Sequence, residues 1–184
     1  TYGVQLLPQM AYLHGRKGGT CMKKINIKIT IPLIIKSAMV LFLVIYLGRL
    51  YVSDYAADIS MDQIASSLET DDAVAALDEP GANGLRRFYQ IDGDSTDGYF
   101  FRKAASPMAV DEAFVVKADT QADAAGYLEA AQSHLESQKN IFEGYGTDQM
   151  ALLNKAVVEK RGRYVWYFCG SDAAKLRQII LSLI

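Results

Sequence analysis

Histidine and cysteine are scarce in this sequence, which has two of each among its 184 residues. Zinc sites draw three or four ligands mainly from these residue types, and a Ser-His-Asp or Cys-His arrangement needs a histidine beside its nucleophile. His134 is the only histidine after the apolar segment described below. It lies off the apolar stripe of a predicted helix, so we expect it to face solvent. We therefore expect no metal site, no cofactor and no catalytic residue.

An excess of positive charge is also missing, because Lys and Arg number 19 against 21 for Asp and Glu. Nucleic-acid binding depends on clustered cations that neutralise phosphates, so we expect no nucleic-acid partner. The charges are nevertheless unevenly distributed, since acidic residues dominate only from Asp54 onward. The charged residues before Gly48 are all basic: Arg16, Lys17, Lys23, Lys24, Lys28 and Lys36.

One long hydrophobic run, at residues 31–52, is the most informative segment. As a helix, its roughly 22 residues would span about 33 Å, which matches the apolar core of a bilayer. Lys36 and Arg49 lie toward its ends, where long side chains reach the headgroups. We predict a transmembrane helix over 31–52. Because basic flanks stay in the cytoplasm, residues 22–30 are expected inside and an extracytoplasmic domain, 53–184, outside.

The residues before and just after this hydrophobic run indicate where translation starts and whether the run is cleaved as a signal peptide. The sequence Tyr-Val-Ser-Asp-Tyr-Ala-Ala-Asp that follows the apolar core has no clean small-x-small cleavage site, which favours an uncleaved anchor. A secreted protein with a cleaved signal peptide is the alternative. Residues 1–21 show no hydrophobic period, and we expect them to be untranslated or disordered. Met22, followed by Lys23 and Lys24, is typical of the start of an exported protein.

The region after residue 53 has the pattern of one α+β domain, a small antiparallel sheet packed against amphipathic helices. Ser-Met-Asp-Gln at 60–63 has the form of a capping box, and Ile64 and Leu68 then share one face. Turn residues at 78–84 end that helical region. The predicted strands are 85–91, 99–104, 109–117, 156–160 and 164–169, and further helices are predicted over 120–142, from Thr147 and from Ser171.

An acidic segment and a cysteine could carry chemistry but are better explained structurally. Residues 92–98 (Asp-Gly-Asp-Ser-Thr-Asp-Gly) begin like an EF-hand calcium loop. Asp97 and Lys103, however, occupy the positions of the invariant glycine and the bidentate glutamate of such loops. We therefore expect an acidic turn between two strands. Cys169 lies in an apolar strand, where we expect a buried free thiol.

Asp111 and Glu112 are the carboxylates most suited to a site. Adjacent strand residues face opposite sides of a sheet, so these two cannot act together as a paired acid and base. One of them could still line a site. The structural explanation, which we favour, is an ion pair with Lys117 or Arg102.

Three segments, at 106–112, 134–145 and 164–173, form a distinctive set. They read Ser-Pro-Met-Ala-Val-Asp-Glu, His-Leu-Glu-Ser-Gln-Lys-Asn-Ile-Phe-Glu-Gly-Tyr and Tyr-Val-Trp-Tyr-Phe-Cys-Gly-Ser-Asp-Ala. Together they resemble domain-of-unknown-function family 4358, over roughly residue 59 to the C-terminus. The resemblance implies a small protein of Firmicutes with a membrane anchor or lipoprotein signal and an extracytoplasmic domain. It implies no lipidation here, because no cysteine follows the apolar run closely, and it supplies no activity.

Two classes of function follow. The preferred one is a membrane-anchored, non-catalytic binding or accessory module of the bacterial cell envelope that binds an envelope protein or a cell-wall polymer. The alternative is an extracytoplasmic enzyme, or enzyme subunit, acting on envelope polysaccharide with Asp111 or Glu112 as general base. A buried carboxylate with a raised pKa would favour the enzyme, and exposed carboxylates the binding module. The expected interaction surface comprises Ser106, Met108, Asp111, Glu112, Gln138, Phe142, Gly144 and Tyr145.

Overall fold

The computed structural model describes residues 27–53 and 56–184, with side chains described for 34–48 and for 56–184. The chain divides into two units, Thr1–Val44 and Ile45–Ile184. The expected start at Met22 and the expected disorder of residues 1–21 lie outside the described residues.

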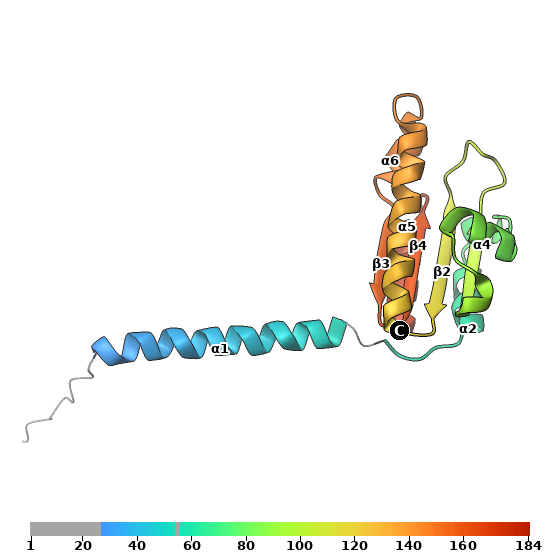
Figure 1. The fold of residues 1–184 in the computed structure, drawn as a ribbon. Coiled ribbons are helices and arrows are strands. Elements are labelled where there is room, and N and C mark those ends of the chain that lie inside the picture. Colours follow the sequence, from blue (N-terminus) through green and yellow to red (C-terminus); the bar gives the residue numbers. More distant parts are fainter. Residues whose placement is uncertain (1–26, 54–55) are drawn as a thin grey trace, which may run out of the picture. The chain divides into compact units, whose positions relative to one another are not determined.

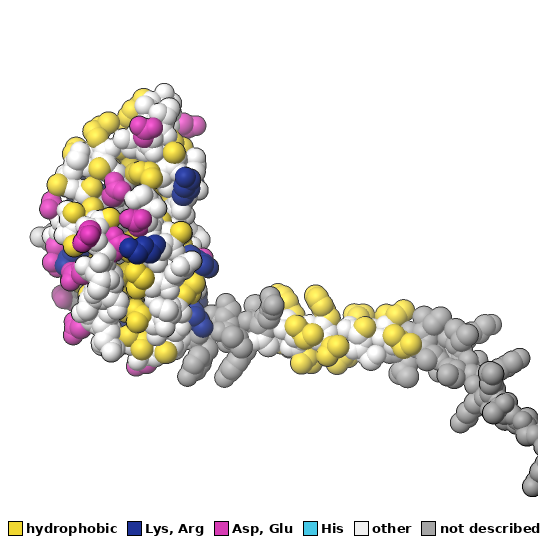
Figure 2. Space-filling model, turned by 180° about the vertical axis from the view of Figure 1, so that it is seen from behind, with side chains coloured by type: hydrophobic (Ala, Val, Ile, Leu, Met, Phe, Trp, Pro, Cys, Tyr) yellow, Lys and Arg dark blue, Asp and Glu magenta, His cyan; other side chains and the backbone are white. Residues whose placement is uncertain are grey.

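Helix α1 (Ile27–Ser53) confirms that the long apolar run is helical. Its large hydrophobic side chains between residues 34 and 47 are each 53–72% exposed. Figure 2 shows hydrophobic side chains on both edges of this helix. Among residues 34–48 and 56–184, whose side chains the structure describes, no helix combines the length and hydrophobicity needed to cross a membrane.

The folded domain is built on a four-stranded antiparallel sheet with the strand order β1-β2-β4-β3. The strands are β1 (Thr96–Lys103), β2 (Glu112–Ala118), β3 (Val157–Arg161) and β4 (Tyr164–Cys169). Every residue of the two central strands, β2 and β4, is buried. Such strands need cover on both faces of the sheet, and helices supply it.

One face of the sheet is covered by α4 (Gly81–Tyr89), α5 (Gln121–Phe142) and α6 (Thr147–Leu153). Figure 1 shows the long helix α5 running along β3 and β4, and α4 contacts it. Alternate strand residues point to this side. The core there includes Leu85, Tyr89, Phe114, Val116 and Tyr167.

The opposite face is covered by α2 (Met61–Leu68), α3 (Asp72–Ala75) and α7 (Ala173–Leu183). Its core includes Ile64, Leu68, Val115, Trp166 and Ile180. The predicted α+β class with a small antiparallel sheet is therefore confirmed, and the sheet lies between two helical layers.

Local signals located several elements correctly. Ser60 is the N-cap of α2, and Thr120 is the N-cap of α5, each accepting a hydrogen bond from a backbone N–H three residues later. Such caps satisfy donors that the first helical turn leaves unpaired. The predicted hairpin at the end of the domain is present as β3 and β4.

The strand predicted at 85–91 is wrong, because residues 81–89 form helix α4. Leu85 and Tyr89, four residues apart, are both buried, as expected of one helix face. Gly84 is also required there, since an added Cβ would lie 3.2 Å from the Phe101 ring and would contact Pro80. The acidic turn at 92–98 therefore connects a helix, not a strand, to β1, and it contains a short 3₁₀ helix, η1 (Gly93–Ser95).

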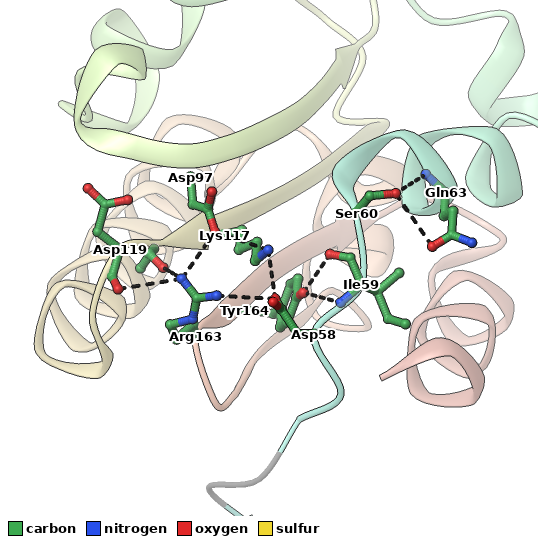
Figure 3. Close-up of polar contacts among 10 residues, drawn as sticks. Asp58, Ile59, Ser60, Gln63, Asp97, Lys117, Asp119, Arg163 and Tyr164 are labelled. Atoms are coloured by element: carbon green, nitrogen blue, oxygen red, sulfur yellow. Dashed lines mark hydrogen bonds and ion pairs between the residues drawn. The ribbon is translucent and has the colours of Figure 1, made fainter.

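The segment before α2 is tied to the domain by a polar network that we call the N-terminal clasp, formed by Asp58, Asp97, Lys117, Arg163 and Tyr164 (Figure 3). Lys117 Nζ lies 2.8 Å from an Asp58 oxygen and 3.0 Å from an Asp97 oxygen. Arg163 contacts the same two carboxylates, each at 3.1 Å. The Tyr164 hydroxyl accepts a hydrogen bond from the Ile59 N–H and donates one to the Ile59 carbonyl.

Contacts within the clasp stabilise the charged forms of Asp58, Asp97 and Lys117. Hydrogen bonds and charges from Lys117 and Arg163 lower the pKa of Asp58 and of Asp97, although partial burial opposes this. For Lys117, burial favours the neutral form, but the hydrogen bonds that its ammonium group donates to Asp58 and Asp97 outweigh burial and raise its pKa. The clasp lies at the Lys117 end of β2, opposite to the Glu112 end.

Candidate functional site

A buried polar cluster lies at the other end of β2, where the strand register brings three side chains together. Glu112 is directly opposite Lys103 of β1 and Cys169 of β4. Directly opposed residues share one face of a sheet, and Cys169 belongs to the core beneath α4 and α5. The side chain of Glu112 therefore points toward these two helices.

Glu112 is only 1% exposed, and both of its carboxylate oxygens are occupied. Tyr89 of α4 donates its hydroxyl hydrogen to Oε1 at 2.5 Å. Lys103 Nζ donates to Oε2 at 2.6 Å, and His134 Nε2 of α5 lies 3.1 Å from the same oxygen. We call these four residues the Glu112 cluster. The ion pairs that we expected for this carboxylate, with Lys117 or Arg102, are wrong.

Lys117 and Arg102 have other partners because of the same register of β1, β2 and β4. Lys117 belongs to the N-terminal clasp, and Arg102 pairs with Glu69 and Glu79 at 2.6 and 2.9 Å. Lys103, one residue further along β1, is the cation that faces Glu112. The register of β1 and β2 decides whether Arg102 or Lys103 contacts the Glu112 carboxylate. This register cannot be read from the sequence.

The Glu112 carboxylate is held in its ionised form. Burial raises its pKa, but the hydrogen bond from His134 and the charges of His134 and Lys103 outweigh burial and lower the pKa below the ordinary value of 4.5. An ionised carboxylate only accepts hydrogen bonds. The hydrogen between the two groups must therefore be carried by Nε2 of His134, which leaves Nδ1 for another partner.

His134 is buried, at 5% exposure, so the expectation that it faces solvent is wrong. Its ring centroid lies 4.7 Å from that of Tyr89, 5.5 Å from that of Tyr167 and 5.9 Å from that of Phe88. Tyr89 is itself stacked on Phe114 at 4.0 Å. These aromatic contacts and the bond to Glu112 fix the orientation of the imidazole.

Tyr167 and Cys169 border the cluster without joining it. Burial and the nearby Glu112 and Asp111 charges raise the pKa of the Cys169 thiol to about 11, so the thiol is protonated at neutral pH and poorly nucleophilic. This confirms the expected buried free cysteine. The Tyr167 hydroxyl is buried and has no hydrogen-bond partner among the described residues. Burial, above all, raises its pKa.

A groove of about 800 Å³ runs between α4 and α5 on the outer side of the cluster. Tyr89 and His134 form its floor, since both line it and both are buried. Its α5 wall carries exposed Gly126, Ser133 and Ser137. The groove is larger than the pocket of about 120 Å³ that Glu112 itself lines.

The expected interaction surface is divided among several places. Ser106 and Met108 are exposed in the β1–β2 loop, and Gly144 and Tyr145 are exposed where α5 ends. A hydrogen bond from Gln149 Nε2 to the Met108 carbonyl, at 3.0 Å, joins the β1–β2 loop to α6, which follows the second segment.

The other four members of that surface lie elsewhere. Gln138 lines the α4–α5 groove, whereas Glu112 and Phe142 are buried and take no part in a surface. Asp111 lines a smaller pocket of about 120 Å³ together with Glu112, Cys169 and residues of α3 and α7.

The family described as Domain of unknown function (DUF4358) matches residues 73–170. The chain belongs to this family. The DUF4358 match begins in α3 and ends just after β4, so it contains all four residues of the Glu112 cluster and the whole α4–α5 groove. Neither the curated proteins nor the solved structures contain a match to the chain.

The sequence resemblance to this family is thereby confirmed, and the site is part of the family domain and not of an addition to it. Within the described residues, no three His, Cys, Asp or Glu side chains gather in a way that could hold a metal ion. The histidine of the cluster was missed because its partner Glu112 is 22 residues away in sequence. The only local signal was its place within the 134–145 segment that carries the family resemblance.

Proposed function

We propose that this protein is a membrane-anchored, extracytoplasmic binding module of the cell envelope whose binding site is the α4–α5 groove. The observation that carries the proposed role is the groove floor, where Tyr89 and His134 are held rigidly by hydrogen bonds to Glu112. Binding sites in proteins are usually preformed hollows with a few fixed polar groups among apolar ones.

The location rests on the hydrophobic helix. Between residues 34 and 47, α1 exposes large hydrophobic side chains in every direction, and a helix that is apolar all round is stable when buried or in lipid. Its 27 residues amount to about 40 Å, enough for a bilayer core of about 30 Å. The basic residues before it and the acidic residues after it favour a cytoplasmic N-terminus.

The state of Glu112 favours binding over catalysis by this carboxylate. An enzyme of the kind considered above needs a buried carboxyl group with a raised pKa that a substrate can still reach. Glu112 is buried, as that alternative requires, but its pKa is lowered and both oxygens are already hydrogen-bonded. A carboxylate so stabilised is a weak base, and no substrate atom can reach it.

One observation supports the enzyme as a second candidate. A carboxylate bonded to one imidazole nitrogen is the arrangement that orients a histidine as general base, and His134, whose Nε2 is bonded to Glu112, lines the groove. On this reading His134, not Glu112, is the base. Isolated cell walls incubated with the wild type and with His134→Gln would separate the two, because only an enzyme releases or modifies wall material in a His134-dependent way.

The proposed site is tested by photo-crosslinking in living cells. A photoreactive amino acid replaces Ser137, which lines the groove, and in a matched strain it replaces Asn140, an exposed residue of α5 that does not line it. We expect a crosslinked adduct at position 137 and none at 140. No adduct at 137, or equal adducts at both positions, would contradict the groove as the binding site.

The proposed location is tested separately by fusing alkaline phosphatase after residue 52. Activity that stays with carbonate-washed membranes supports the uncleaved anchor. Activity released into the medium supports the alternative of a cleaved signal peptide, and absence of activity contradicts the extracytoplasmic placement.

A further inference from the structure

We infer that the α4–α5 groove binds a chain of uncharged sugar residues, with a sugar hydroxyl bonded to Nδ1 of His134. This inference rests on the proposed function, because it names the ligand of the proposed site.

The groove has the shape of a site for a chain. Residues from Asp123 to Ile141 of α5 line it, a length of about 27 Å along the helix. Several small residues of α5 line it, among them Gly126, Ser133 and Ser137. A Cβ added at Gly126 would meet nothing within 4 Å, so that part of the wall faces open space.

The buried histidine indicates that this hollow receives a polar ligand. His134 is 95% buried, and its Nε2 is committed to Glu112. Within the described domain, Nδ1 has no hydrogen-bond partner, and it is not among the buried side-chain atoms that lack one. Nδ1 is therefore accessible, and since the His134 side chain lines the groove, a ligand hydroxyl in the groove can form a hydrogen bond with it.

A hydroxyl group suits this nitrogen in either protonation state of the ring. With Nε2 carrying its hydrogen, Nδ1 of the neutral imidazole is an acceptor, and Nδ1 of the protonated imidazole is a donor. A hydroxyl both donates and accepts, whereas a peptide N–H only donates and a carbonyl only accepts. Sugar chains present many hydroxyls at fixed spacing.

The remaining lining fits an uncharged sugar. Ser133, Ser137 and Gln138 offer neutral donors and acceptors along α5, while Phe88 and Tyr127 offer aromatic surfaces for apolar C–H groups. Tyr127 is fixed by donating a hydrogen bond to the Ser95 carbonyl at 2.7 Å.

Charge argues against an anionic polymer. Arg87 is the one cation among the described residues that line the groove, and Asp123 and Glu129 oppose it. A phosphate-rich chain would be repelled by the two carboxylates and would find a single positive partner. The groove therefore has no complementarity to polymers that carry repeated negative charge.

The usual ways of binding a peptide are not available either. All residues that line the groove belong to α4, α5 and the two residues after α4. No strand edge is present to pair with an extended peptide, and the polar row on α5 does not match the apolar face of an amphipathic helix.

Isothermal titration of the full chain in phospholipid nanodiscs tests the inference. The probes are β-1,4-linked N-acetylglucosamine hexamer, maltohexaose, a polyphosphate and a proline hexapeptide; nanodiscs avoid detergents with sugar headgroups. We expect at least one hexasaccharide to bind. Ser133→Trp, which fills the groove, should weaken binding at least tenfold, and Gln132→Trp, on the neighbouring exposed position outside the groove, should leave it unchanged.

A second substitution addresses the histidine itself. In His134→Gln the amide nitrogen can replace Nε2 in the bond to Glu112 while Nδ1 is lost, so we expect about a tenfold weaker affinity, the value of one hydrogen bond. Titrating a hexasaccharide into the wild type should also shift the His134 imidazole NMR signal, which is distinguished from that of His14 by a His14→Gln variant. This measurement does not depend on the folding of a groove variant.

The outcomes separate the inference from the proposed function. Failure of both hexasaccharides to bind, or binding of the polyphosphate or the proline peptide instead, overturns the sugar ligand. If position 137 still crosslinks in cells, the groove remains a binding site for another class of ligand. If position 137 does not crosslink, the proposed site itself is wrong.

Discussion

Replacing Glu112 by Gln tests whether the Glu112 cluster holds the domain together. The substitution keeps the size of the side chain and removes its charge, leaving Lys103 and His134 without their shared anion. Removing one partner of a buried ion pair costs 3–5 kcal/mol. Lys103 is 14% exposed and can regain some hydration, and the amide oxygen still accepts one hydrogen bond. We therefore expect a loss near the lower limit, about 3 kcal/mol in the free energy of unfolding.

The measurement is urea and thermal unfolding in nanodiscs, followed by the fluorescence of Trp166. This residue is the single tryptophan of the chain and is 1% exposed, so its emission reports the opening of the core. For a domain of this size, about 3 kcal/mol corresponds to a fall of roughly 10 °C in Tm. Glu69→Gln is the matched control, because Glu69 is 42% exposed in its pair with Arg102 and such pairs contribute at most about 1 kcal/mol.

The pH dependence of the same loss provides the refutation. The pKa of Glu112 is lower in the folded protein than its ordinary value of 4.5. Its contribution is therefore complete above about pH 4.5 and disappears as the pH falls through the folded pKa. The difference between wild type and Glu112→Gln should shrink below pH 4.5. A difference that stays constant down to pH 3, or a loss below about 1 kcal/mol at pH 7, would refute the ionised cluster.

Three further predictions follow from single positions. Gly126→Ala should stabilise the protein by about 0.5–1 kcal/mol, because alanine is the better helix former and the added Cβ has room; urea unfolding measures this, and a destabilised variant would mean that α5 is closed there. Cys169 should stay unmodified by iodoacetamide at pH 8 in the folded protein and react after unfolding, since its thiol pKa is about 11; rapid native labelling would contradict its burial. Tyr164→Phe should lower the free energy of unfolding by about 1–2 kcal/mol, because the hydrogen bonds to Ile59 are lost. The same variant should be cleaved faster by proteases near residue 58. An unchanged cleavage rate would show that the clasp does not hold this segment.

The elements that could be predicted from sequence are those specified by neighbouring residues. Ser60 and Thr120 cap their helices through bonds to residues three positions later, so a short window contains the whole interaction. Helix α4 was missed because Pro80, Gly81 and Gly84 are typical of turns. A Cβ at Gly84 would clash with the nearby Pro80 side chain and would also crowd the Phe101 ring at 3.2 Å; the second of these is a long-range contact.

The candidate site depended on contacts of that second kind. Glu112 could be singled out as a carboxylate near a strand, but its partners come from α4, β1 and α5. Polar neighbours such as Ser133 and Glu136 made His134 resemble a solvent-exposed helix residue. Burial of a histidine is favourable only when a partner such as Glu112 is present, and the packing of α5 on the sheet provides that partner.

The N-terminal clasp also determines how the domain responds to tension on the segment that precedes it. Asp58 is bound to Lys117 on β2, and Ile59 is bound to Tyr164 on β4, so a pull on this segment reaches the two central strands before it reaches α2. Side chains that join separate parts of the sheet therefore carry the load, and α2 carries little of it. Because the clasp and the Glu112 cluster lie at opposite ends of β2, about 17 Å apart, strain at the clasp is kept away from the groove floor.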